Sequence, residues 1–239
     1  MRTSGLLWFA TLLCVSTSQT PAAVITIKTG QVGGVPGSCP GADDTFRRWA
    51  PRPPCGQPIL SAAFQSADFD SACAGPPPVV VVPDPFAWVQ GLPCDPDARW
   101  IASRLSILYP TQCWGERQSV LYCAPFTNHD DCAVADSIRI CWAVDDYLGD
   151  PSGFPGPNPG GIYVNGTDLG PAFSGLGANQ QRTAVAYNVP LNAGANRLEV
   201  YQRDAGCGIA GLILSARVYT CGTVAVQQRP WGSVKTLFR

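Results

Sequence analysis

Short runs of alternating hydrophobic and polar residues recur along the chain. Residues 137–144 read Ser-Ile-Arg-Ile-Cys-Trp-Ala-Val, which places Ile138, Ile140 and Trp142 together on one face of a strand. Further strands are predicted over residues 24–28, 119–124, 162–164, 183–189, 197–202 and 212–219. Since no segment keeps a 3.6-residue period for three turns, the pattern predicts an all-β fold, a single antiparallel β-sandwich or jelly roll. Trp142, and Trp100 with it, are expected in the core.

Glycine and proline separate these strands. The chain has 25 Gly and 23 Pro among its 239 residues. Asn165-Gly166 is the commonest sequence of a two-residue type I′ hairpin turn. Residues 30–58 are rich in Gly and Pro without a sustained period, which predicts a disulfide-pinned loop region. This loop region is expected near the start of one domain that spans residues 24–222.

The amino terminus has the features of a secretory signal. Met1-Arg2 precedes an apolar run over residues 5–15, which is long enough for a signal peptide and too short to cross a bilayer. Small residues favour cleavage between residues 18 and 23, so residues 1–23 are predicted to be removed. Lipidation at Cys14 is the alternative, but Leu13 is a poor residue to precede it. The protein is therefore expected to be secreted, or held at the cell surface without a transmembrane segment.

Removal of the signal takes one of the 11 cysteines and leaves an even number. The remaining ten are Cys39, Cys55, Cys73, Cys94, Cys113, Cys123, Cys132, Cys141, Cys207 and Cys221. An even number of cysteines in an exported chain indicates disulfides. Zinc binding is the alternative, but no pair has the Cys-x-x-Cys spacing and the chain has a single histidine. The sequence does not determine the pairing; Cys39 with Cys55 and Cys73 with Cys94 are the local closures that we expect.

Four sequence motifs, taken in their order along the chain, resemble those of a known protein family. They are Asp-Ala-Arg-Trp-Ile at 97–101, the strand region 133–146, Gly-Ile-Tyr-Val-Asn-Gly at 161–166, and 191–200 with Gly-Leu-Ile at 211–213. Together they resemble galactose-binding-like jelly-roll domains, closest to versions in exported bacterial proteins that often carry cell-surface sorting signals. The resemblance covers about residues 64–221. The heavy cysteine content and the Pro-rich insert at 151–159 depart from that family.

The resemblance implies a non-catalytic module that binds carbohydrate or another cell-surface ligand through loops at one end of the sandwich. It also implies that a structural calcium ion is possible, and no other cofactor is expected. The aspartates that could hold calcium are Asp68, Asp70, Asp95, Asp97, Asp145, Asp146 and Asp150, and none has EF-hand spacing. We favour instead that Asp145 and Asp146 accept backbone N–H bonds where a strand turns.

Residues for catalysis are scarce. His129 is the only imidazole, no Gly-x-Ser-x-Gly elbow is present, and Glu116 and Glu199 are the only glutamates. An enzyme is therefore not expected. A net charge of −1 provides no field for a nucleic-acid backbone.

Sugar binding needs an aromatic face and planar polar groups. Trp114, in the polar loop after Cys113, and Tyr147, after Asp145 and Asp146, are the candidate ligand-binding residues together with those two carboxylates. Packing of Trp114 against a disulfide is the alternative interpretation.

Two questions stay open at this level. Residues 223–239 lie beyond the last cysteine and are expected to form a flexible tail, with docking on a protein partner as a hypothesis for its role. The expected partner of the domain itself is a glycan or another cell-surface ligand. The alternative is an extracellular structural or adhesive protein whose domain serves assembly.

Overall fold

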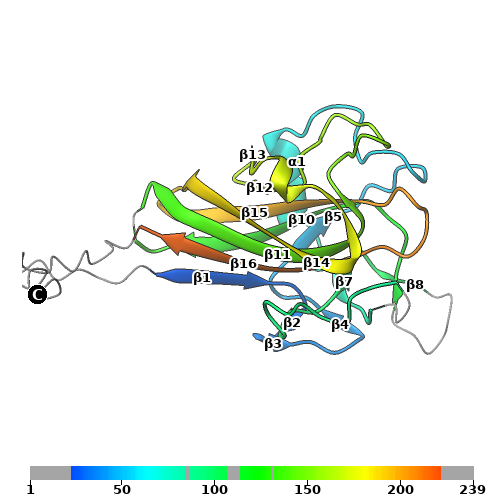
Figure 1. The fold of residues 1–239 in the computed structure, drawn as a ribbon, viewed down its shortest axis with the longest axis horizontal. Helices are drawn as coiled ribbons and strands as arrows, with labels where there is room; N and C mark the ends of the chain where they lie inside the picture. Colours follow the sequence, from blue (N-terminus) through cyan, green and yellow to red (C-terminus); the bar gives the residue numbers. More distant parts are fainter. Residues whose placement is uncertain (1–22, 84–86, 107–113, 131, 222–239) are drawn as a thin grey trace, which may run out of the picture. The chain divides into compact units, whose positions relative to one another are not determined.

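A computed structural model describes residues 23–83, 87–106, 114–130 and 132–221 (Figure 1). The predicted signal peptide, apart from Ala23, and the predicted tail lie outside these residues. The described residues belong to one compact unit, Ala23–Cys221. None of the helices in this part of the chain is long and apolar enough to span a membrane.

Strands dominate the described chain, as the alternation predicts. The long strands are β1 (Val24–Lys28), β10 (Val120–Asn128), β11 (Val134–Leu148), β14 (Gly175–Pro190), β15 (Gly194–Arg203) and β16 (Gly211–Thr220). The short ones are β2 (Gln31–Val32), β3 (Val35–Pro36), β4 (Gly41–Ala42), β5 (Arg47–Trp49), β6 (Val79–Val80), β7 (Ile101–Ala102), β8 (Leu105–Ser106), β9 (Trp114–Gly115), β12 (Ile162–Val164) and β13 (Thr167–Asp168). One α-helix, α1 (Ser66–Ala74), and one 3₁₀ turn, η1 (Pro171–Phe173), complete the described elements.

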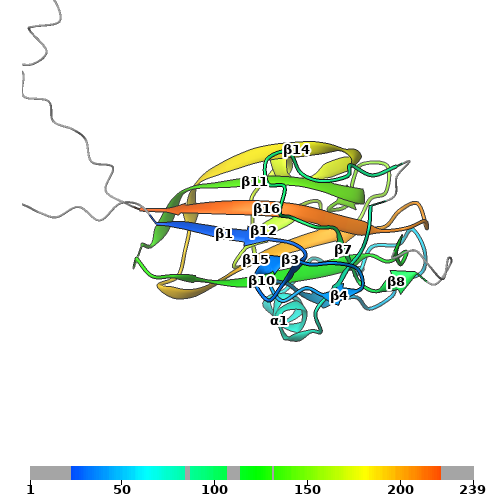
Figure 2. The ribbon, with the colours of Figure 1, turned by 90° about the horizontal axis from the view of Figure 1, so that it is seen from below.

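The main sheet is antiparallel and strongly curled, in the manner of a half-barrel. One limb, the β11 limb, consists of β14, β11, β16 and β1 side by side (Figure 2). The other, the β10 limb, consists of β12, β15, β10 and β5. The two limbs join where β11 leaves β16 and its last residue Leu148 pairs with Gln202 of β15. The all-β antiparallel prediction is therefore confirmed, while the jelly-roll connectivity stays a prediction.

The main core lies between the two limbs. Ile138, Ile140 and Trp142 of β11 face it, together with Tyr122 of β10 and Val200 of β15. The expectation that one face of residues 137–144 points inward is thus confirmed, and Trp142 is almost fully buried. Trp100 is buried as well, but in a second cluster outside the β11 limb, where it stacks on Trp88 at a ring-centroid distance of 4.1 Å.

The predicted hairpin at Asn165-Gly166 is present between β12 and β13. Val164 pairs with Thr167, and both turn residues have positive φ, 52° at Asn165 and 78° at Gly166. A type I′ turn needs this left-handed backbone at both central positions, which asparagine and glycine tolerate best. The loop region at 30–58 is less irregular than expected, since β5 within it pairs with β10.

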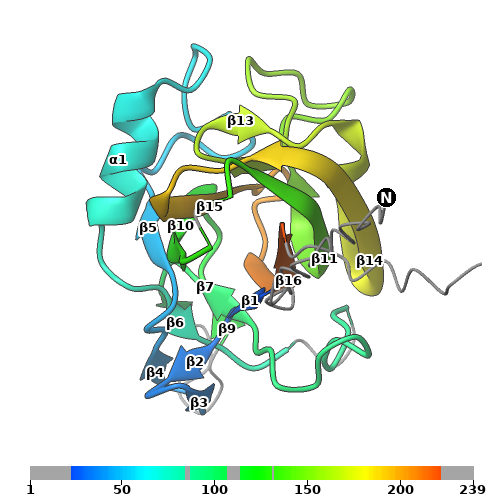
Figure 3. The same cartoon turned by 90° about the vertical axis from the view of Figure 1, so that its left-hand side faces the viewer.

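Helix α1 is a difference from the sequence prediction, which contained no helix. It covers the outer surface of β10 (Figure 3), where Phe69 and Ala72 pack on Leu121 and Tyr163. Its first turn is closed by a capping box, in which the backbone N–H of Gln65 donates to Asp68. Nine residues with two buried positions are too few to give a clear period, which explains why the pattern did not reveal it.

Four disulfides are present among the described residues, in agreement with the cysteine count. They join Cys55 to Cys207, Cys73 to Cys123, Cys94 to Cys141 and Cys132 to Cys221. Cys39 is disulfide-bonded too. The local closures Cys39–Cys55 and Cys73–Cys94 are wrong. The sequence separations of the four bonds run from 47 to 152, because antiparallel strands bring distant residues together. Four disulfides are typical of proteins in an oxidising environment, such as the cell exterior.

Candidate functional site

The predicted ligand-binding aspartates lie at one end of the sheet, where β11 and β15 end and β16 begins. Asp145 pairs with Gly211, the first residue of β16. The indole Nε1–H of Trp88 donates to Oδ2 of Asp145 at 2.8 Å. Asp146 Oδ2 accepts the backbone N–H groups of Ala205 at 2.9 Å and Gly206 at 2.5 Å. The expected backbone N–H acceptance is confirmed for Asp146, whereas Asp145 accepts from a tryptophan side chain.

A third carboxylate, Asp204, completes a cluster with these two. Its Oδ1 accepts the backbone N–H of Cys207 at 2.8 Å, and its carboxyl group interacts with that of Asp146, as does the carboxyl group of Asp145. Burial, together with the Asp146 carboxyl, raises the pKa of Asp145 well above its usual range. Burial raises the pKa of Asp204 to about 6. At least one of these groups therefore keeps its proton near neutral pH.

This cluster does not fit a calcium site. Hydrogen-bond donors of the protein already contact an oxygen of each carboxylate, and the raised pKa values favour neutral carboxyl groups over the charged ligands that calcium prefers. Within the described ranges, no set of three His, Cys, Asp or Glu residues is arranged to hold a metal ion.

Beside the cluster lies a pocket with a volume of about 270 Å³, called here the Cys207 pocket. Asp204 and the Cys55–Cys207 disulfide form one side of it. The other lining residues are Arg52, Pro53, Pro54, Gly56, Glu116, Arg117, Gln118 and Ser119. The lining is thus rich in planar charged and polar groups, which can bond the hydroxyl groups of a small polar ligand.

Several contacts hold the charged groups of the pocket in place. The guanidinium of Arg117 donates to the carbonyl oxygen of Cys207 at 3.3 Å. Glu116 forms an ion pair with Arg104, with 2.5 Å between Nε and Oε2. The Ser119 hydroxyl oxygen accepts the backbone N–H of Asp204 at 3.1 Å. Since all of these contacts are made within the protein, the pocket is preformed.

A buried ion pair contacts the lining of the pocket. Arg203 binds Asp150 with an Nη1 to Oδ1 distance of 2.5 Å, and both side chains are almost fully buried. The same guanidinium donates to the carbonyl oxygen of Gly56 at 2.7 Å, which fixes the pocket wall next to the Cys55–Cys207 disulfide. Tyr201 also donates to Asp150, at 3.0 Å. Removal of either charge would leave its partner buried and unpaired.

Two residues that line the pocket have an unusual backbone. Arg52 and Cys207 both have φ of 60°, a left-handed conformation that residues other than Gly and Asn rarely adopt. The other positive-φ residues among the described non-glycines are Asn165 and Asn188, for which this conformation is ordinary. Strained backbone of this kind is held by the surrounding structure and concentrates at functional sites.

The two predicted aromatic residues lie outside the lining of this pocket. Trp114 is half-buried in β9, where it pairs with Ser106 of β8, two residues before Glu116. Tyr147 packs on Phe154 of the Pro-rich insert, at a ring-centroid distance of 5.7 Å. Their role as ligand platforms stays a prediction.

The structure adds residues that the sequence analysis did not select. Arg52, Arg117 and Asp204 are the charged groups that the fold brings together. Each lies within three residues of Cys55 or Cys207, or in the polar segment after Cys113, so charged residues flanking cysteines were the available signal. The signal is weak, because it acquires meaning only once the pairing of Cys55 with Cys207 is known.

No family model, curated protein or solved structure matches this chain. The resemblance to galactose-binding-like domains therefore stays a prediction that rests on its four motifs.

Proposed function

We propose that this protein is a secreted, non-catalytic module of the galactose-binding-like jelly-roll type, which binds a carbohydrate in the Cys207 pocket. The observation that carries the proposal is the convergence of Arg52, Glu116, Arg117 and Asp204 on a preformed hollow of about 270 Å³. Planar charged groups bond vicinal hydroxyls in pairs, and such a volume suits one sugar unit better than an extended chain. The four disulfides support an extracellular location.

The test is binding of the full secreted protein to a glycan array, followed by calorimetric titration with the best neutral oligosaccharide. Arg117→Ala removes an exposed guanidinium from the pocket and is expected to weaken binding about tenfold, without a change in melting temperature. Arg182→Ala is the matched control, because Arg182 is exposed on β14 and does not line the pocket. Trp114→Ala, tested in parallel, decides whether that indole contributes to the same site.

Two results would overturn the proposal. Equal affinity of the Arg117→Ala and Arg182→Ala variants would remove the pocket as the site. Cleavage of the bound oligosaccharide, followed by chromatography of the products, would show that the module is catalytic.

Assembly is a second candidate function, and one specific feature favours it. Strand β14 is 16 residues long and, among the described strands, pairs only with β11. A long free edge exposes backbone N–H and C=O groups that can pair with a strand of another molecule. Sedimentation velocity between about 1 and 100 µM protein would detect such self-association at typical micromolar affinities. A monomer over that range would argue against assembly.

A further inference from the structure

The outer surface of the β11 limb has a regular arrangement of side chains on the N-terminal side of Cys141 in β11. Across one row, Ser137 of β11 is paired with Tyr187 of β14 and Tyr219 of β16. Across the next row, Arg139 is paired with Val185 and Arg217 on the same two strands. Successive rows on one face of a strand are about 6.6 Å apart. We call the surface formed by Ser137, Arg139, Val185, Tyr187, Arg217 and Tyr219 the open face.

Arg139 and Arg217 are directly opposite each other on this face. Both are exposed, and cross-strand partners have Cβ atoms about 4.5–5.5 Å apart, a distance at which like charges destabilise a sheet. Neither guanidinium forms an ion pair with any carboxylate that the structure describes. Two cations are thus held together without an internal counter-ion.

A small hollow of about 110 Å³ lies between these arginines and the Cys94–Cys141 disulfide. Ser215 completes its lining. The volume is sufficient for a single carboxylate or sulfate group but not for a sugar ring. Two guanidinium groups around such a hollow can bind an anionic group through several charge-assisted hydrogen bonds.

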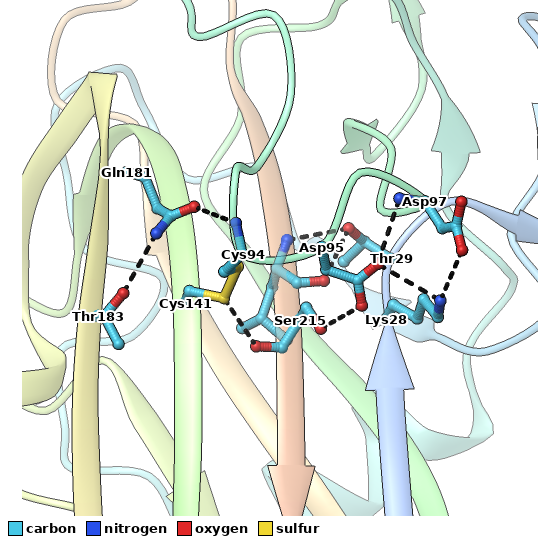
Figure 4. Close-up of a disulfide and its surroundings, with 10 residues drawn as sticks. Lys28, Thr29, Cys94, Asp95, Asp97, Cys141, Gln181, Thr183 and Ser215 are labelled. Carbon is cyan, nitrogen blue, oxygen red and sulfur yellow. Dashed lines mark hydrogen bonds and ion pairs between the residues drawn. A yellow bond between two sulfur atoms is a disulfide. The ribbon is translucent and has the colours of Figure 1, made fainter.

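Asp95, the carboxylate that binds Ser215 of the hollow, is already paired with a lysine. Asp95 accepts the hydroxyl hydrogen bond of Ser215 at 2.7 Å and pairs with Lys28 Nζ at 3.4 Å (Figure 4). Lys28 also pairs with Asp97, at 3.3 Å. On the other side of the disulfide, the backbone N–H of Cys94 donates to the side chain of Gln181 at 3.0 Å (Figure 4). These contacts hold the wall of the hollow in place. Because Lys28 already neutralises Asp95, this carboxylate does not neutralise Arg139 and Arg217.

An exposed aromatic ring lies beside the arginines. Tyr187 is 71% exposed, the largest exposed fraction among the bulky apolar side chains of the described residues. It lies one row from Val185, which is paired with Arg139. A tyrosine ring offers an apolar surface on which the C–H face of a sugar ring can stack.

We propose that the open face binds an acidic polysaccharide, with one carboxylate or sulfate group in the hollow between Arg139 and Arg217 and a neighbouring sugar ring on Tyr187. The surface is separate from the Cys207 pocket, since the hollow between the two arginines shares no lining residue with that pocket. The proposal does not depend on the function proposed for that pocket.

The test uses the full secreted protein and calorimetric titration in low salt with five probes. They are an oligogalacturonate, its neutral methyl ester, a sulfated galactan oligosaccharide, inorganic sulfate and a single-stranded DNA oligonucleotide. The wild type is expected to bind at least one acidic oligosaccharide about tenfold more tightly than the methyl ester. The oligogalacturonate and the sulfated galactan distinguish a carboxylate from a sulfate as the group recognised. Inorganic sulfate is expected to bind more weakly than the sulfated oligosaccharide, because it lacks the stacked ring.

Variants locate the binding. Arg139→Gln with Arg217→Gln is expected to reduce affinity for the acidic oligosaccharide at least about tenfold, and Tyr187→Ala to reduce it by a smaller factor. Arg182→Gln is the control: Arg182 is also an exposed arginine, on β14, but its register partner Trp142 faces the core, so Arg182 points away from the open face. The double variant should be as stable as the wild type or more stable, because like charges no longer face each other.

Four outcomes would overturn the proposal. They are equal binding of the oligogalacturonate and its methyl ester together with no preference for the sulfated galactan, unchanged affinity of the double arginine variant, an equal loss in Arg182→Gln, and tighter binding of the DNA oligonucleotide than of either acidic oligosaccharide. Arg117→Ala separates this site from the Cys207 pocket, since it should leave binding of acidic probes intact.

Discussion

The two limbs of the sheet have the same inward alternation but very different outer surfaces. On the β10 limb, Leu121, Tyr163 and Tyr201 point outward and are buried under α1 and the segment before it, where Phe64 packs on Tyr201. On the β11 limb, the outward positions of the open face hold Arg139, Tyr187 and other exposed or half-exposed residues, and no described element covers them. The outward residues, rather than the core, thus decide which surface the protein buries and which it presents to a partner.

The boundary between covered and open surface lies on β11 itself. Ala143 and Ile213 are covered by Trp88 and Trp100 of the preceding segment. Cys141, two residues before Ala143, is joined to Cys94, and the open face begins beyond it. One disulfide therefore marks the place where the covering segment ends.

The largest expected effect is the difference in stability between two aromatic truncations, one on the covered outer surface and one on the open face. Phe69→Ala should lower the free energy of unfolding by about 3–5 kcal/mol, because it leaves a cavity between α1 and the β10 limb. Tyr187→Ala on the open face should change it by less than about 0.5 kcal/mol. Urea unfolding followed by tryptophan fluorescence measures both.

A similar loss in the two variants would contradict the distinction between a covered and an open surface. Phe69→Leu serves as the control for α1, since it keeps most of the buried volume and should recover much of the stability.

The next effect compares the disulfide beneath α1 with the one at the edge of the open face. Cys73–Cys123 and Cys94–Cys141 close segments of 50 and 47 residues, so the loss of chain entropy in the unfolded state is nearly equal, and each contributes about 2–4 kcal/mol. Replacing Cys73 and Cys123 by alanine should cost more than replacing Cys94 and Cys141, because nine-residue α1 is too short to persist without its attachment.

Chemical denaturation of the two double-alanine variants measures the difference directly. Equal losses would mean that both bonds act only on the unfolded chain. Loss of helical circular dichroism at 222 nm in the Cys73/Cys123 variant alone would locate the excess in α1.

A last expected effect is the pH dependence that three buried carboxyl groups give to the stability of the fold. Burial raises the pKa of Asp145, of Asp204 to about 6 and of Asp43 to about 6. Between about pH 4 and pH 8 the folded protein therefore holds protons that the unfolded chain has released, and its stability falls as the pH rises through this window. Each unit by which the folded pKa exceeds the unfolded value lowers stability by at most about 1.4 kcal/mol across this window, and solvent screening reduces that figure for the partly exposed groups.

Asp145→Asn should remove part of this fall and raise the melting temperature at pH 8 but not at pH 4, since an amide oxygen can still accept the bond from Trp88. Asp136→Asn, at an exposed position of the same strand, is the control. A variant that melts lower than the wild type at pH 8 would show that the Asp145 charge stabilises the fold.

The sequence predicted the features that depend on local pattern. The Asn165-Gly166 hairpin and the inward face of Trp142 follow from backbone preference and from period-two alternation, and both are confirmed. The even cysteine count indicated disulfides, but not that Cys55 lies beside Cys207, which depends on the register of distant strands. The same dependence hid the Cys207 pocket, whose charged residues come from three separate segments.

The missed helix has a related cause. Residues 120–124 on β10 are buried on both faces and show no clean alternation, in contrast to residues 137–142 on β11. That lack of alternation was the signal that something covers the outer surface of β10. It indicates that another segment packs on β10, but not that this segment is a helix. Within α1, only Phe69 and Ala72 are buried, so its own sequence shows little helical periodicity.

The two ends of the described unit leave it side by side, since the backbone N–H of Thr220 donates to the carbonyl oxygen of Ala23 at 3.1 Å. A pulling force applied there would load the antiparallel pair β1 and β16 one hydrogen bond at a time, the direction in which a sheet resists least. The load would soon reach covalent links, because the Cys55–Cys207 bond allows the force to bypass residues 56–206 and the Cys132–Cys221 bond anchors the end of β16. A tethered copy of this protein would thus yield at β1 first, while the bonds at Cys55 and Cys132 keep the rest of the sheet connected under tension.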